Sequence, residues 1–189
     1  LDKADALRAH RRALLERLDA LPGAVIEQMM ANRSDEVDVI PFGEVADLVG
    51  GRNLVADDPH TDSPFRVLKI SAVTSGRFKP SESKPLPVGY TPPKEHLVRA
   101  GDLLMSRANT TELVGAVAYV DSTPTNLALP DKVWRFVWRD PSSVPLFYEA
   151  LFQRPTIRRK ISALSSGSGG SMKNVSKSKL HGMLIPRVP

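Results

Sequence analysis

The chain has 189 residues, of which 41% are hydrophobic and 25% charged, a composition typical of one medium globular domain with an appendage or of two small domains. It contains no cysteine, which excludes disulfides, thiolate zinc sites and cysteine nucleophiles. No apolar run approaches the roughly 18 residues of a membrane helix, so we expect no membrane partner and a cytoplasmic location. The helical pattern is already under way at Leu1, which indicates a piece of a longer protein.

The net charge of +5 is unevenly distributed along the chain. Residues 1–36 hold six basic and seven acidic side chains, whereas residues 37–189 hold 20 and 14. No acidic residue follows Glu149. Such a tract attracts polyanions, of which nucleic acid is the usual one, although a solvated basic face is the alternative.

Residues 2–32 are predicted to form one long helix with a narrow apolar row. The spacing of this row is that of a heptad repeat, and its members are Leu7, Leu14, Leu18, Leu21 and Val25. Pro22-Gly23 predicts a kink or a junction between two helices. So narrow a row requires a partner helix, and packing on the chain's own domain is the alternative.

Residues 37–140 carry short apolar stretches that are separated by turn residues. Four of these stretches predict strands, at 67–70, 103–105, 114–120 and 133–138. The connections between them are long and rich in Pro, Ser and Asp, notably 50–65, 76–96 and 121–131. Helical spacing returns over 144–164, where Pro155 separates two helices. A Ser- and Gly-rich loop follows at 165–171.

Patterns that would indicate catalysis are missing. The four histidines show no ligand spacing, so we predict no metal site. The glycines at 167–170 are not followed by the Gly-Lys-Ser/Thr of a P-loop, and no Gly-x-Gly-x-x-Gly follows a strand. We therefore predict no catalytic residue in this chain.

Side chains suited to DNA follow the strand that ends at Met105. Arg107 has the chemistry to donate two hydrogen bonds to guanine, and Asn109 to pair with adenine, in the major groove. Asn and Thr are also common turn residues, so a purely structural turn is the alternative. Lys69 interrupts an apolar strand and is a further candidate for DNA contact. The alternative is that its aliphatic stem lies along the apolar surface while its charged end reaches water. Lys173 and Lys177 add positive charge just after a glycine-rich loop whose backbone N–H groups suit a phosphate.

These segments together resemble the specificity subunit of type I restriction-modification systems. The resemblance depends on the order of five segments, namely Leu1–Met30 as the conserved-region helix, Val67–Val73 with Gly76 as a first core strand and turn, the Ala100–Arg107 sequence AGDLLMSR, Val114–Val117, and a closing motif from Ile161 to Pro186. Nearly the whole chain is covered.

The resemblance implies an α+β fold, in which a mixed-sheet target recognition domain at 37–189 follows a long coiled-coil-forming helix at 1–36, the assembly arm. It also implies that the chain is not an enzyme and holds no cofactor. Methylation would belong to partner DNA adenine methyltransferase subunits that use S-adenosylmethionine, and cleavage to restriction subunits that act as a translocase-nuclease. The family usually carries two recognition domains, so a second specificity half or helix is a further expected partner.

On this interpretation, the chain reads one half of a bipartite target in double-stranded DNA. The residues expected to contact DNA are Arg52, Asn53, Lys69, Ser71, Arg77, Lys79, Arg107, Asn109, Thr110, Lys132, Ser171, Lys173, Asn174 and Lys177. The alternatives are a non-catalytic coiled-coil interaction module with an incidental basic surface and, less favoured by the missing cofactor motifs, a DNA-modifying enzyme.

Overall fold

The computed structural model describes residues 2–31, 38–167 and 172–187. Contacts within the chain divide it into two units, Leu1–Asp38 and Val39–Pro189. Each unit is described by itself below.

The first unit is the helix α1, which runs over 30 residues from Asp2 to Ala31. It continues through Pro22 and Gly23, so a junction of two helices at that point, one of the sequence-based alternatives, is wrong. Leu7 and Leu14 are 70% and 45% exposed. The side chains of Leu18, Leu21 and Val25 lie outside the described part of the structure. What covers this apolar row therefore stays a prediction.

The second unit is built on a four-stranded antiparallel sheet with the order β2-β9-β5-β7. Its strands are Ala46–Gly50, Val133–Trp138, Leu103–Ser106 and Val117–Tyr119 respectively. The strand predicted at 133–138 is confirmed. Its burial alternates from Trp134 and Phe136, which are 3% exposed, to Val137, which is 41% exposed, but Val133 breaks the alternation because it is fully buried.

Smaller sheets complete this unit. In the mixed sheet β4-β3-β8, β3 (Arg66–Leu68) pairs antiparallel with β4 (Ser83–Pro85) and parallel with β8 (Leu127–Ala128). β1 (Val39–Pro41) pairs with β11 (Leu184–Pro186), and β6 (Ala108–Asn109) pairs with β10 (Lys173–Asn174). The α+β class is confirmed, with several small sheets where one mixed sheet was expected.

The strand predicted at 114–120 is shorter in the structure, where β7 begins only at Val117. Gly115 has φ +77° and its N–H donates to the Ser106 carbonyl at 2.7 Å, so the chain turns before the strand starts. A Cβ at Gly115 would lie 2.5 Å from Cγ2 of Ile161. The turn therefore lies directly against helix α3 (Pro155–Leu164), which the local sequence pattern does not reveal.

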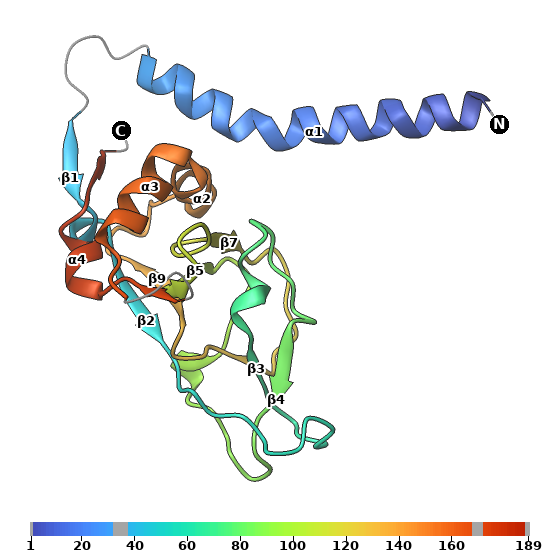
Figure 1. Ribbon diagram of the computed structural model, residues 1–189, viewed down its shortest axis with the longest axis vertical. Coiled ribbons are helices and arrows are strands. Elements are labelled where there is room, and N and C mark those ends of the chain that lie inside the picture. The colour runs from blue at the N-terminus through green and yellow to red at the C-terminus, as the bar shows by residue number, and fades with distance from the viewer. Residues whose placement is uncertain (1, 32–37, 168–171, 188–189) are drawn as a thin grey trace. The chain divides into compact units, whose positions relative to one another are not determined.

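Besides the small cluster of Val67, Leu86 and Ala128, two buried clusters hold the second unit together. Phe42, Phe136 and Phe152 pack edge to face, with ring centroids 5.2 to 5.4 Å apart. Leu104, Val133 and their neighbours form the other cluster, to which Ala72 of the 3-10 turn η2 (Ile70–Ala72) and the adjacent Val73 also belong. Phe152 belongs to α2 (Pro145–Gln153), which packs on β7 and β5 (Figure 1).

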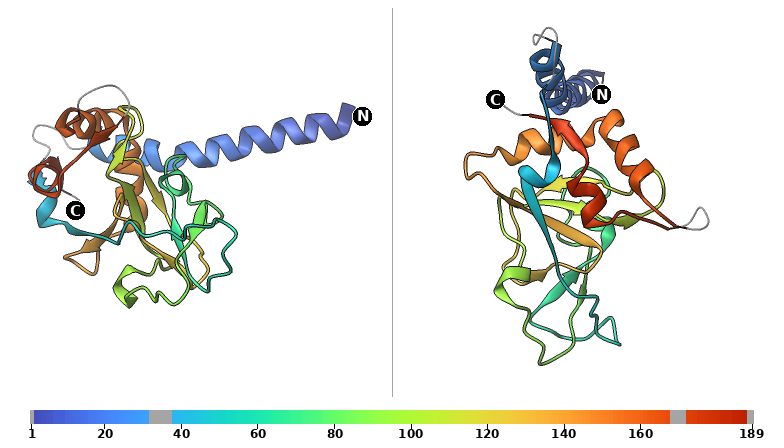
Figure 2. Two further views of the ribbon diagram at one scale, coloured as in Figure 1. Left: turned by 60° about the horizontal axis from the view of Figure 1, so that its bottom comes forward. Right: turned by 90° about the vertical axis from the view of Figure 1, so that its left-hand side faces the viewer.

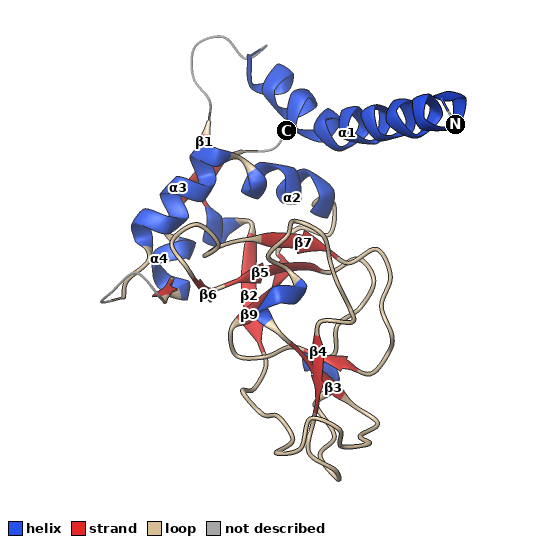
Figure 3. Ribbon diagram, turned by 45° about the vertical axis from the view of Figure 1, so that its right-hand side comes forward, coloured by secondary structure: helices blue, strands red, loops and turns tan. Residues whose placement is uncertain are grey.

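The remaining short helices are α4 (Lys177–His181) and the 3-10 turns η1 (Phe42–Glu44), η2 (Ile70–Ala72) and η3 (Lys94–His96). Two further views place β3, β4 and the loops around them at the end of this unit that lies away from α2 and α3 (Figure 2). Loops form most of that end (Figure 3). The expected contacts Lys69, Ser71, Arg77 and Lys79 belong to the connection between β3 and β4.

Candidate nucleic-acid interface

One end of the four-stranded sheet gathers residues that are far apart in the sequence. β2 ends at Gly50, which pairs with Trp134 of β9. β5 ends at Ser106, which pairs with Val133 of the same strand. The segments beyond these strand ends therefore meet, and we call this region the basic sheet end. Its predicted DNA contacts are Arg52, Asn53, Arg107 and Lys132.

Backbone hydrogen bonds connect the segments of the basic sheet end. The N–H of Gly51 donates to the Pro130 carbonyl at 3.0 Å, and the N–H of Arg107 donates to the Lys132 carbonyl at 3.0 Å. A Cβ at Gly51 would lie 1.8 Å from the Leu129 carbonyl oxygen, so only glycine permits this approach. The segment that ends with Lys132 thus touches both the Arg52 loop and Arg107.

Arg107 is the most firmly held side chain of this group. Its guanidinium carbon lies 5.4 Å from the centroid of the Trp134 ring, a cation–π contact. Its carbonyl accepts from the N–H of Val175 at 3.0 Å, so both backbone polar groups of Arg107 are bonded. The indole therefore restricts the plane of a guanidinium whose backbone is also fixed.

Two buried polar atoms near this end have no hydrogen-bond partner among the described residues. They are Nε of Arg107 and Oδ1 of Asp131, which precedes Lys132. Unpaired buried polar atoms are rare in folded proteins and call for an explanation, of which a functional site is one.

Trp134 is a residue of this site that the sequence analysis missed. Its ring lies between Arg107 and Gly50, where a Cβ would come within 2.9 Å of Cδ1 of the indole. The alternation of β9 identifies Trp134 only as an inward-facing aromatic residue. Its contact with Arg107 depends on the pairing of β5 with β9, which no local pattern contains.

The short ribbon of β6 and β10 adds three predicted contacts beside Arg107. Asn109 pairs with Lys173, and Ala108 pairs with Asn174. Lys173 Nζ donates to the Gly167 carbonyl at 3.3 Å. Asn109 Oδ1 accepts from the N–H of Thr110 at 2.8 Å, so Asn109 also has the turn role that was its structural alternative. Ser171 lies outside the described residues.

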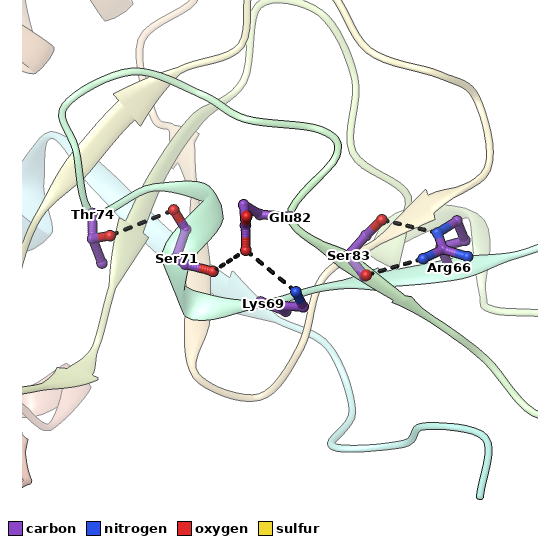
Figure 4. Close-up of polar contacts among 6 residues, drawn as sticks. All are labelled: Arg66, Lys69, Ser71, Thr74, Glu82 and Ser83. Atoms are coloured by element: carbon purple, nitrogen blue, oxygen red, sulfur yellow. Dashed lines mark hydrogen bonds and ion pairs between the residues drawn. The ribbon is translucent and has the colours of Figure 1, made fainter. Parts of the chain in front are cut away.

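A second group of predicted contacts surrounds a glutamate that the sequence analysis missed. Lys69 Nζ lies 3.3 Å from Glu82 Oε2, and Ser71 Oγ donates to the same oxygen at 2.6 Å (Figure 4). The Ser71 hydrogen bond, followed by the hydrogen bond and charge of Lys69, lowers the pKa of Glu82 below its ordinary value. Lys69 and Ser71 thus lie together, with a carboxylate between them.

Arg77 and Lys79 follow this group in the same loop. Gly76 turns the chain with φ +73°, and Lys79 donates its backbone N–H to the Ala72 carbonyl at 2.9 Å. Both side chains are exposed. The structure gives them a common loop with Lys69.

Lys177 is not at the basic sheet end. It begins α4, and its charge acts on Asp47 of β2, which pairs with Val137 and precedes Gly50 by three positions. The backbone N–H of Leu48 is the main cause of the lowered pKa of Asp47, with a smaller contribution from the charge of Lys177.

The described residues include no group of three or more His, Asp or Glu side chains arranged to hold a metal ion. Among the helices of the described ranges, none is both long and apolar enough to cross a membrane.

No protein-family model matches the chain. By structure, the chain is similar to the S subunit of a type I restriction-modification system from M. genitalium, with a TM-score of 0.52 and 14% identity over 79% of this chain and 34% of that one. The HsdS subunit from Thermoanaerobacter tengcongensis aligns with 99% of this chain and 45% of its own at 19% identity, but its TM-score of 0.43 is too low to define a common fold.

By sequence, the chain is 29% identical over 123 residues to the type I restriction enzyme EcoEI specificity subunit of Escherichia coli. The match covers 65% of this chain and 21% of that subunit, so the chain spans about a fifth of its relative. This confirms the resemblance predicted from the motifs: the chain is similar to part of a type I restriction-modification specificity subunit.

Proposed function

We propose that the chain is a non-catalytic target recognition domain with an assembly arm, which reads one half of a bipartite target in double-stranded DNA. The observation that carries the proposal is the basic sheet end, where Arg107 is held on Trp134 beside Lys132 and Lys173. These cations come from three segments that are distant in the sequence. A basic surface that is merely solvated does not require such segments to converge.

The roles of the cations follow from their surroundings. A fixed, planar guanidinium suits the two acceptors of guanine, so Arg107 is the base-reading residue and Asn109 its neighbour for adenine. Lys173, on the β10 edge, suits a phosphate and positions the protein without reading sequence. Arg52, Asn53, Thr110, Lys132 and Asn174 are the further DNA contacts that we propose for this end.

The arm supplies the proposed assembly. α1 exposes Leu7 and Leu14 on the row whose heptad spacing suits a second helix, from another specificity half or from the same longer protein. DNA adenine methyltransferase subunits, which use S-adenosylmethionine, dock on the pair formed by α1 and this second helix. Restriction subunits join the complex. The chain itself holds no cofactor.

Selection from a pool of duplexes with a random core tests the proposal. We expect the chain to enrich one short motif, with affinity that falls as salt rises at a log–log slope of roughly −0.9 per phosphate contact. Binding without any preferred motif would contradict it.

A coiled-coil interaction module is the second candidate, favoured by the exposed leucine row of α1. Charge reversal at Lys173 and Lys177 separates the two. Unchanged DNA binding in that variant would support the interaction module, and its loss supports the recognition domain.

A further inference from the structure

The carboxylate of Glu82 is an unexpected group on a surface proposed to bind DNA, because phosphates repel it. It is not isolated, since Lys69 Nζ and Ser71 Oγ both contact its Oε2 (Figure 4). The side chains of Lys69 and Glu82 are 40% and 37% exposed, so a ligand can reach both. The pair presents a donor and an acceptor side by side.

We propose that the Lys69–Glu82 pair reads one G·C base pair in the major groove, an inference that rests on the proposed function. Glu82 accepts a hydrogen bond from the N4 amino group of cytosine, and Lys69 donates to O6 of the paired guanine. Of these two residues, only Lys69 was predicted from the sequence to contact DNA. Glu82 is therefore the added specificity-determining residue.

The geometry of the pair matches the edge of that base pair. In a G·C pair, O6 and N4 are adjacent because they bond to each other at about 2.9 Å, and both also face the major groove. The Lys69 and Glu82 atoms are 3.3 Å apart, a similar separation with complementary polarity. The second hydrogen of N4 is the one that remains for Glu82.

The loop holds both residues in place before any ligand arrives. The backbone N–H of Lys69 donates to the Glu82 carbonyl at 2.9 Å, which connects the two residues independently of their side chains. Ala72 and Val73, just beyond Lys69, belong to the same buried cluster as Val133 of the basic sheet end. Ionised, Glu82 is a pure acceptor, and its contacts with Ser71 and Lys69 lower its pKa further below the ordinary value. Lys69 offsets its repulsion from phosphate.

The experiment compares Glu82→Ala with Asp140→Ala, in the full chain, by selection from a duplex pool with a random core. Asp140 is the matched control because it is also an exposed carboxylate that accepts a hydrogen bond from a serine hydroxyl, that of Ser142. It differs in position, since it follows the end of β9 that is opposite to the basic sheet end. Lys69→Met tests the partner. Circular dichroism checks that each variant is folded.

We expect Glu82→Ala to lose about tenfold in preference for cytosine at one position while other positions keep theirs. Lys69→Met loses preference at the same base pair, and Asp140→Ala changes no preference. If Glu82→Ala instead raises affinity for all duplexes equally, Glu82 only repels phosphate and the proposal is overturned. Loss at an A·T pair overturns the G·C assignment. A wild-type chain that enriches no motif fails the proposed function itself, which is a distinguishable result.

Discussion

The guanidinium of Arg107 lies over the indole of Trp134, 5.4 Å from the ring centroid, although 27 positions separate the two residues in the sequence. The pairing of Ser106 with Val133 brings them together at the ends of β5 and β9. Because the backbone of Arg107 is bonded on both sides, the indole determines where a long side chain points. In the proposed interface, this contact pre-positions the donors of Arg107 and lowers the entropy lost on binding.

Replacing Arg107 by alanine should lower affinity for the selected duplex by about 1–3 kcal/mol and relax preference at one position. Lysine should not restore this preference, because a point charge lacks the planar pair of donors that matches guanine. Fluorescence anisotropy with the selected duplex and single-base variants measures both effects. Unaltered affinity and specificity in Arg107→Ala would remove Arg107 from the interface.

Trp134 should act through Arg107. We expect Trp134→Leu to weaken binding of the selected duplex by roughly 0.5–2 kcal/mol, the range of a cation–π contact, while Trp134→Phe keeps most of the affinity. Because leucine could also disturb the core, Gly50→Ala is a second variant, whose Cβ would press on Cδ1 of the indole from 2.9 Å. In an Arg107→Ala background, Trp134→Leu should have no further effect on affinity. An additive effect there would mean that Trp134 acts independently of Arg107.

Lys173 should contribute charge without selectivity. Lys173→Ala should weaken binding to all duplexes about equally and reduce the magnitude of the salt slope by about one. Titrations of matched and mismatched duplexes at several salt concentrations test this. A change confined to one base position would make Lys173 a base-reading residue instead.

The exposed row of α1 should mediate assembly. The double variant Leu7→Asp and Leu14→Asp should lose co-purification with the methyltransferase subunits, because two exposed leucines, each worth roughly 1.5–3 kcal/mol on burial, lose their apolar contact. Ala6→Asp with Ala13→Asp is the matched control, since these positions have the same seven-residue spacing but lie off the row. Circular dichroism should show the second unit intact in both variants. Complex formation that survives the leucine changes would place the assembly surface elsewhere.

Glu149 should make stability depend on pH. Burial raises its pKa above the ordinary 4.5, even though the N–H of Tyr119 donates to Oε1 at 2.8 Å. Between pH 4.5 and the raised pKa, the folded state binds more protons than the unfolded chain, so ionisation of Glu149 costs stability as pH rises. Glu149→Gln keeps the acceptor and removes that cost.

The melting temperature of Glu149→Gln should therefore exceed that of the wild type at pH 7, and the difference should vanish as pH falls below 4.5. Glu82→Gln is the control of opposite sign. Because the pKa of Glu82 is lowered, its charge favours folding at neutral pH, and this variant should be the less stable one there. Equal pH profiles for wild type and Glu149→Gln would contradict the first expectation.

The sequence by itself determined the elements whose signal is local. The helix expected over 2–32 is α1, the strand at 133–138 is β9, and the helix break at Pro155 separates α2 from α3. These predictions are confirmed because side-chain periodicity and the missing N–H of proline have their effect within a single helix or strand. The resemblance to type I specificity subunits also follows from the order of segments in the chain, and the similarity to the Escherichia coli subunit agrees with it.

Only the tertiary structure decided which of these segments meet. β7 starts late because Gly115 lies against Ile161, and Trp134 supports Arg107 because β5 pairs with β9. Glu82 joins Lys69 across a loop of 12 intervening residues, through a backbone bond and an ion pair. Strand register and loop closure depend on packing contacts among residues that are distant in the sequence. No single segment of the sequence therefore predicts them.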